Sequence, residues 1–187
     1  MTKIRILLVL TALVFATLAC TMFVGGPDYP EGAIPVSAQA VESLRNQIES
    51  AVLAGAESGE ITLQLTEEQL TSYIAFKLAA QEDPILQNPQ VYLRDGQMQV
   101  YGKVKRGYFV ANVLVVLNVT VDELGQPAIE IASADFGPLP APDSLKESLT
   151  AILTEAYTGS LGPIATGFRL ENINIANGLM TVTGRIK

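Results

Sequence analysis

One hairpin pattern occurs twice in this chain, and the repeat constrains the fold more than any other feature. Residues 91–104 (VYLRDGQMQVYGKV) align without a gap on residues 173–186 (INIANGLMTVTGRI), 82 positions later. Asp-Gly in the first copy and Asn-Gly in the second supply the positive φ angles of a two-residue hairpin turn, and apolar residues alternate on both sides. A fixed period marks one recurring supersecondary unit, so we interpret the two stretches as copies. Each hairpin buries one face only and needs an apolar partner.

Composition excludes several classes of function. The 187 residues suit a single domain with a sizeable core, and the formal net charge of -7 repels a phosphate backbone, so no nucleic acid partner is expected. The chain has no His, which removes the commonest general base and metal ligand. A single Cys allows neither an internal disulfide nor a thiolate metal cluster. We therefore expect no catalytic residue, no metal site and no cofactor.

The N-terminus has the form of an export signal. Lys3 and Arg5 precede an apolar run over residues 6–19, and small residues lead to the only cysteine, Cys20. The sequence Thr-Leu-Ala-Cys at 17–20 resembles the lipobox of bacterial lipoproteins, in which the cysteine becomes the lipid-modified first residue. The alternative is an uncleaved membrane helix, because residues 6–24 have about the length that crosses a bilayer core. Both interpretations predict an extracytoplasmic chain anchored to a bacterial membrane.

The segment after the signal is rich in glycine and proline, which mark turns and linkers. We therefore expect a signal peptide over residues 1–19, a tether over residues 20–35 and one domain over residues 36–187.

Three helices are predicted within that domain. Apolar residues at spacings of three and four from Val41 to Val52 predict an amphipathic helix that ends at Gly55. A capping box at 66–69 opens a second helix, and another at 144–147 opens a third.

The remaining apolar patterns are those of strands. A strand is predicted at 60–65, a very long one at 108–122 with one wholly apolar face, and another at 127–136. The predicted fold class is α+β: a curved antiparallel sheet built from two repeated hairpins plus a long central strand, packed by about three amphipathic helices.

Charged residues offer little chemistry. Glu67, Glu68 and Asp135 are the acids that a catalytic pair would need, but the glutamates lie in a helix first turn, where the helix dipole favours them. The basic group of Lys103, Lys105 and Arg106 has two interpretations, a solvated face or a site for an anionic head group, and we favour the solvated face.

Apolar surface is abundant. It can close into an ordinary core, or it can leave a groove of the kind that holds a lipid tail. The candidate ligand-binding residues for a groove are those of the long strand and the two hairpins: Met98, Val100, Val113, Val115, Leu117, Val119, Met180 and Val182. Cys20 is the candidate lipid attachment point.

The pattern resembles a known family. The Ile-Thr-Leu-x-Leu-Thr-Glu-Glu-x-Leu segment at 61–70, followed by repeated Asp/Asn-Gly-x-Met-x-Val-x-Gly strands, is similar to the YpmS-like lipoproteins and the LmeA-like phospholipid-binding envelope proteins. The resemblance covers most of residues 60–187. It implies an elongated α+β fold related to tubular lipid-binding domains, with acyl chains held between helix and curved sheet. It carries over no individual site residue.

Two functions remain in view. The first is a non-enzymatic, membrane-anchored extracytoplasmic lipoprotein that binds or shuttles a phospholipid or other amphiphile. The second is an envelope scaffold with a solid core and no small-molecule ligand. A hydrolase is a third, less favoured class.

Overall fold

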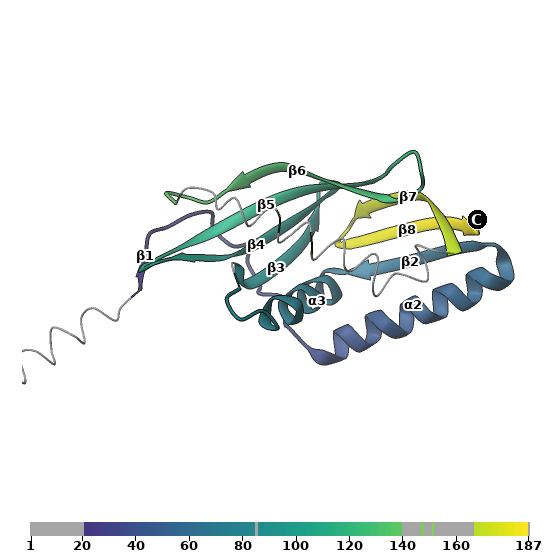
Figure 1. The fold of residues 1–187 in the computed structure, drawn as a ribbon, viewed down its shortest axis with the longest axis horizontal. Coiled ribbons are helices and arrows are strands. Elements are labelled where there is room, and N and C mark those ends of the chain that lie inside the picture. Colours follow the sequence, from purple (N-terminus) through teal and green to yellow (C-terminus); the bar gives the residue numbers. More distant parts are fainter. Residues whose placement is uncertain (1–20, 85, 140–146, 148–150, 152–166, 187) are drawn as a thin grey trace, which may run out of the picture.

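The structure, a computed structural model, describes residues 21–84, 86–139, 147, 151 and 167–186, and these form an α+β fold with two sheets (Figure 1). The described helices are α2 (Ala38–Ser58) and α3 (Glu67–Ala79). The strands are β1 (Met22–Phe23), β2 (Glu60–Thr66), β3 (Leu86–Arg94), β4 (Gln97–Arg106), β5 (Phe109–Val121), β6 (Pro127–Asp135), β7 (Phe168–Ala176) and β8 (Leu179–Ile186).

Sheet A is a curled half-barrel around the long strand β5. On one edge of β5 lies β4, followed by β3; the other edge is shared by β6 and the short β1. All of these pairs are antiparallel except β1 with β5, where Met22 and Phe109 are partners in a parallel register. The long predicted strand is confirmed, whereas the expectation of a wholly antiparallel sheet is wrong at this one pair.

Sheet B contains β2, β8 and β7 in that order, all antiparallel. The repeat is confirmed as two hairpins, β3–β4 and β7–β8, and their turns have the same backbone: φ is 53° and 76° in both. The prediction of one sheet containing both hairpins is wrong. The second strand of each copy has a different neighbour, because β4 pairs with β5 while β8 pairs with β2.

The helices cover different parts of the two sheets. In Figure 1, α2 lies along sheet B and α3 lies under β3. The capping box of α3 is confirmed, with the Thr66 hydroxyl accepting from the backbone N–H of Gln69 at 3.2 Å. Neither described helix combines the length and the hydrophobicity needed to cross a bilayer. The third predicted helix falls at 144–156, which apart from residues 147 and 151 lies outside the described residues.

The predicted end of the first helix is wrong. Gly55 lies inside α2, which continues to Ser58 and ends at Gly59 in the left-handed conformation. A side chain at position 55 would come within 2.8 Å of the Phe168 ring, so the glycine lets the helix approach sheet B. The sequence shows a glycine but not the ring that packs against it.

The two sheets and both helices share one apolar core. The cluster includes Leu44 and Ile48 of α2, Ile74 of α3, and inward-facing residues of every strand from β2 to β5 and of β7 and β8. The β5–β6 turn joins the sheets directly, since the N–H of Leu170 on β7 donates to the carbonyl of Gly125 at 3.0 Å.

The segment at 21–35, expected to be a tether, lies against sheet A. The N–H of Asn112 donates to the carbonyl of Gly25 at 2.9 Å, and its amide donates to the carbonyl of Pro27 at 3.1 Å. Further along, the amide side chain of Gln90 on β3 bonds both the N–H and the carbonyl of Ile34. The segment therefore crosses the sheet from β5 to β3 before α2 begins.

Candidate apolar binding site

The residues that the sequence selected as ligand contacts lie mostly inside the core. Six of the eight are buried on the inner faces of the two sheets: Met98, Val100, Val113, Val115, Leu117 and Met180. The other two, Val119 and Val182, are half-buried and pack against the same cluster. Cys20 lies outside the described residues.

The inner face of sheet A is less covered toward the far end of β5. Val119 pairs with Ile129 and Leu117 with Ile131 across the β5–β6 ladder, so these side chains share one face. Val119, Ile129 and Ile131 are half-buried, whereas the preceding residues of β5 on that face are fully buried. Part of the predicted apolar face thus remains open to contact at this end.

A groove lies between α2 and α3. Its volume is about 710 Å³, within the range of 300–1,000 Å³ that is typical of small-molecule sites. Apolar and charged side chains from both helices line it: Val41, Leu44, Arg45, Ile48, Glu49, Val52, Leu53, Tyr73, Phe76 and Lys77.

The groove exposes large apolar side chains at its mouth and buries others in its floor. Leu53 and Phe76 are 69% and 47% exposed, while Leu44, Ile48 and Tyr73 are buried beneath them. Phe76 also borders a second groove of about 690 Å³ beside β3, so its ring forms a ridge between two hollows. Large hydrophobic residues exposed at grooves mark surfaces that bind apolar partners.

Two polar groups at the groove, the Tyr73 hydroxyl and the Lys77 ammonium, could contact a ligand. The Tyr73 hydroxyl is buried and has no hydrogen-bond partner among the described residues, which is unusual for a buried polar atom. The ammonium of Lys77 lies 5.7 Å from the centre of the Tyr73 ring, within cation–π range. A chain with an apolar body and an anionic end would meet matching groups here.

Sequence reasoning assigned the apolar stripe of α2 to packing on a sheet, and so it missed the groove. Leu44 and Ile48 do pack inward, as that stripe predicts. Two residues indicate a second apolar surface. Leu53 directly follows Val52, so the two side chains point to different faces of α2. Phe76 lies outside the stripe of buried residues on α3.

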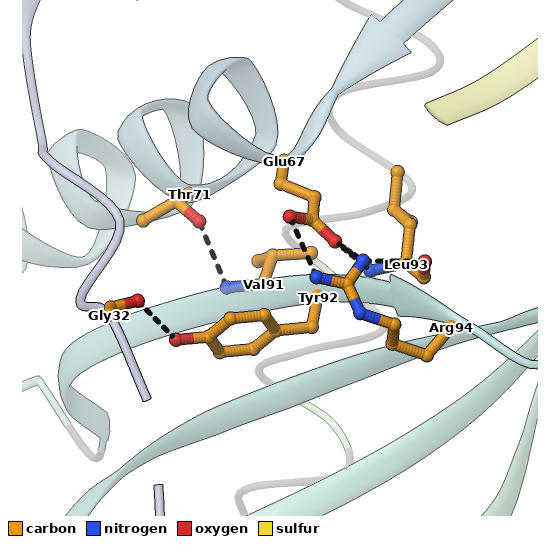
Figure 2. Close-up of polar contacts among 7 residues, drawn as sticks. All are labelled: Gly32, Glu67, Thr71, Val91, Tyr92, Leu93 and Arg94. Atoms are coloured by element: carbon orange, nitrogen blue, oxygen red, sulfur yellow. Dashed lines mark hydrogen bonds and ion pairs between the residues drawn. The ribbon is translucent and has the colours of Figure 1, made fainter. Parts of the chain in front are cut away.

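The acids considered for catalysis have structural partners. Figure 2 shows that Glu67 lies beside the edge of β3, where its carboxylate accepts from the Leu93 N–H at 2.8 Å and forms an ion pair with Arg94. One oxygen of Asp135 accepts from the Gly137 N–H at 2.8 Å in a local turn. In the described part of the chain, no three acidic, His or Cys side chains gather as a metal site would require.

No known protein family matches the chain, and no curated protein matches it. Among solved structures, it is similar to the crystal structure of lipopolysaccharide binding protein, with 11% sequence identity and a TM-score of 0.22. The match covers 81% of this chain and 48% of that chain, so this chain spans about half the length of that protein. A likeness this weak assigns no family.

Proposed function

We propose that this chain is a membrane-anchored extracytoplasmic protein that binds the acyl chain of a phospholipid or similar amphiphile in the groove between α2 and α3. The observation that carries the proposal is the groove itself, with exposed Leu53 and Phe76 above a buried apolar floor. The resemblance to the YpmS-like and LmeA-like proteins points to the same class of ligand, although the predicted location was the sheet face.

The charges at the groove favour an amphiphile over a purely apolar ligand. Arg45 and Lys77 lie among its lining residues and provide two cations for an anionic head group. Glu49 is the one acid among these lining residues, and Glu42 beside the groove forms an exposed ion pair with Arg45 at 3.8 Å. An acyl chain in the groove would gain about 0.8 kcal/mol for each methylene removed from water.

The test is lipid retention by the full chain purified from bacterial membranes in mild detergent. Phe76→Gln should reduce the lipid recovered by solvent extraction and the binding of a fluorescent phosphatidylglycerol. Leu124→Gln is the matched control, because Leu124 is also an exposed apolar side chain but lies in the β5–β6 turn, away from the groove. Equal lipid recovery from both variants would contradict the groove as the site.

The anchor is tested separately at Cys20. Metabolic labelling with a radioactive fatty acid should mark the wild-type chain and leave Cys20→Ser unlabelled. Equal labelling of both would contradict a lipoprotein and favour an uncleaved N-terminal helix.

A second candidate, an envelope scaffold that acts through protein contacts, is favoured by one observation. The sheet face that would line a lipid tunnel is packed into the core from Val113 to Leu117. In this case the groove beside Phe76 receives an apolar segment of another protein. A well-folded wild-type chain that carries no extractable lipid and binds none of the fluorescent probe would support the scaffold.

A further inference from the structure

One end of the molecule carries exposed aromatic and apolar side chains. There, β1 pairs with the start of β5, and the N–H of Met22 donates to the carbonyl of Tyr108 at 2.6 Å. We call the surface formed by β1 and the β4–β5 turn the tip. Its large side chains are 45–65% exposed: Met22, Phe23, Tyr108 and Phe109. Figure 1 shows β1 at one end of the molecule and the end of β8 at the other.

The charge of the tip is opposite to that of the whole chain. Lys105 and Arg106 are exposed at the end of β4, and neither has an ion-pair partner among the described residues. The sequence contains no acid from Lys103 to Val121 or from residue 20 to residue 27, although the net charge is -7.

The acids of the adjoining elements include the exposed Glu82 and Asp83, which precede β3, and Leu86 at the start of β3 is paired in register with Val104. Asp28 follows Pro27, whose carbonyl accepts from the side chain of Asn112. Asp135 is paired in register with Leu114, about 17 Å along β5 from Phe109 at the usual strand rise. None of these acids forms an ion pair with Lys105 or Arg106 among the described residues, so both cations stay exposed at the turn.

We propose that the tip docks on the surface of an anionic phospholipid bilayer. Aromatic side chains favour the boundary between head groups and acyl chains, and adjacent lysine and arginine attract anionic lipid. The position of the tip in the chain selects a membrane over a protein partner. The apolar run at 6–19 and Cys20 directly precede Thr21, so either form of anchor brings the membrane to β1. This inference rests on the anchor of the proposed function but not on the groove.

The chain offers a clean spectroscopic test because it contains no Trp. Tyr108→Trp places the only tryptophan at the tip, and Leu124→Trp places it in the exposed β5–β6 turn at the far end of β5. Each full-length variant is reconstituted into vesicles of phosphatidylcholine and phosphatidylglycerol, with and without brominated acyl chains. Bromine should quench the emission of Y108W and leave that of L124W unchanged. Phe23→Trp gives a second tip position should Y108W fail to fold by circular dichroism.

A charge reversal tests the electrostatic part. In the Y108W background, Lys105→Glu should reduce quenching in vesicles that contain phosphatidylglycerol, whereas Arg185→Glu, at the opposite end of the molecule, should leave it unchanged.

The outcomes separate the proposals. Variants that float with the vesicles while emission from both tip positions is unquenched would overturn docking of the tip and leave the anchor intact. A chain that does not float would overturn the anchor and the docking together. Loss of lipid from Phe76→Gln alone tests the groove and contradicts neither the anchor nor the docking of the tip.

Discussion

Gly102 and Gly184, matched positions of the repeat, each face an irregularity in the neighbouring strand. The register of β3 shifts between Gln87 and Gln90, opposite Gly102, and that of β7 shifts between Leu170 and Asn172, next to Gly184. Bulges bring backbone closer than a regular ladder does, and glycine permits the approach. The sequence showed the repeated glycines; their reason became visible only with the partner strands.

The two glycines should differ in their tolerance of alanine. A Cβ at position 184 would lie 2.6 Å from the carbonyl oxygen of Arg169, whereas a Cβ at position 102 would meet the side chain of Leu86. Backbone cannot move aside as a side chain can, so Gly184→Ala should cost more stability than Gly102→Ala, about 1–3 kcal/mol in the worse case. Urea unfolding of both variants measures the difference. An equal or reversed order would contradict this account of the bulge.

Tyr29 makes the stability of the fold depend on alkaline pH. Burial raises its pKa from 10.0 to about 12, and the nearby Tyr92 adds to the shift. Between these values the unfolded chain loses the phenol proton while the folded chain keeps it, so stability should fall as pH rises from about 10 to 12. The buried hydroxyl also lacks a hydrogen-bond partner in the part of the chain that the structure describes, so Tyr29→Phe removes no bond seen there.

We expect Tyr29→Phe to keep its stability at pH 7 and to lose less of it above pH 10 than the wild type does. Thermal unfolding followed by circular dichroism at several pH values measures this. The loss of stability with rising pH that remains in Tyr29→Phe comes from other tyrosines. One of these is Tyr92, whose pKa is also raised, chiefly by burial. An unchanged alkaline slope would show that Tyr29 is exposed in solution.

At the scale of elements, α3 takes the place of a neighbouring strand along β3. Two backbone N–H groups of β3 donate to side chains of this helix: Val91 to Thr71 at 2.9 Å and Leu93 to Glu67 at 2.8 Å (Figure 2). An open edge invites pairing with another chain, and covering it with a helix prevents this. Glu67 and Glu68 were read from sequence as acids in a helix first turn; the sequence does not show that Glu67 also reaches β3.

Thr71→Val should test this edge. The substitution keeps the shape of a fully buried side chain but leaves the Val91 N–H without its acceptor, which should cost about 1–3 kcal/mol. Thr62→Val is the matched control, because Thr62 is exposed on β2. Chemical unfolding should show a loss for Thr71→Val and little change for Thr62→Val. Equal stabilities would mean that water reaches the strand edge.

Elements whose partners are close in sequence could be predicted, whereas pairings between distant parts of the chain could not. The hairpins, the capping box of α3 and the long strand are local patterns, and all are confirmed. The pairing of β2 with β8 joins Glu60 to Arg185, far apart in the chain, and no local pattern marks it. Without this pair, the two hairpins were assigned to one sheet. The contacts of the segment at 21–35 with β3 and β5 are also distant in the chain, and no local pattern marks them.

At the scale of the whole molecule, the two sheets close on a common core, and this decides the role of the predicted ligand face. Alternating apolar residues along a strand look the same whether they face a cavity or a packed interior. The face from Ala111 to Leu117 is buried, and only its continuation at Val119 is partly open. The groove between α2 and α3 required the relative placement of two helices, which sequence periodicity does not provide.

Leu117→Asp and Val119→Asp provide a paired test of this core. Leu117 is 1% exposed, so an unpaired carboxylate there should unfold the chain. Val119 points to the same face two residues later but is half-buried, and its variant should remain folded with a lower melting temperature. Circular dichroism and thermal unfolding measure both. A folded Leu117→Asp chain would restore the sheet face as the wall of a ligand cavity.

If the chain is anchored at Cys20 as proposed, the pairing of β1 with β5 limits how far the domain can move from the membrane. Met22 is already fixed to the sheet, and only Thr21 separates it from Cys20. Two residues extend at most about 7 Å, so an anchored domain stays within a fraction of its own length of the bilayer. If β1 detached and the chain became extended as far as Pro35, the domain could move about 50 Å from the anchor. Under the proposed anchor, a ligand bound while β1 is docked would therefore be released at the membrane that holds the anchor.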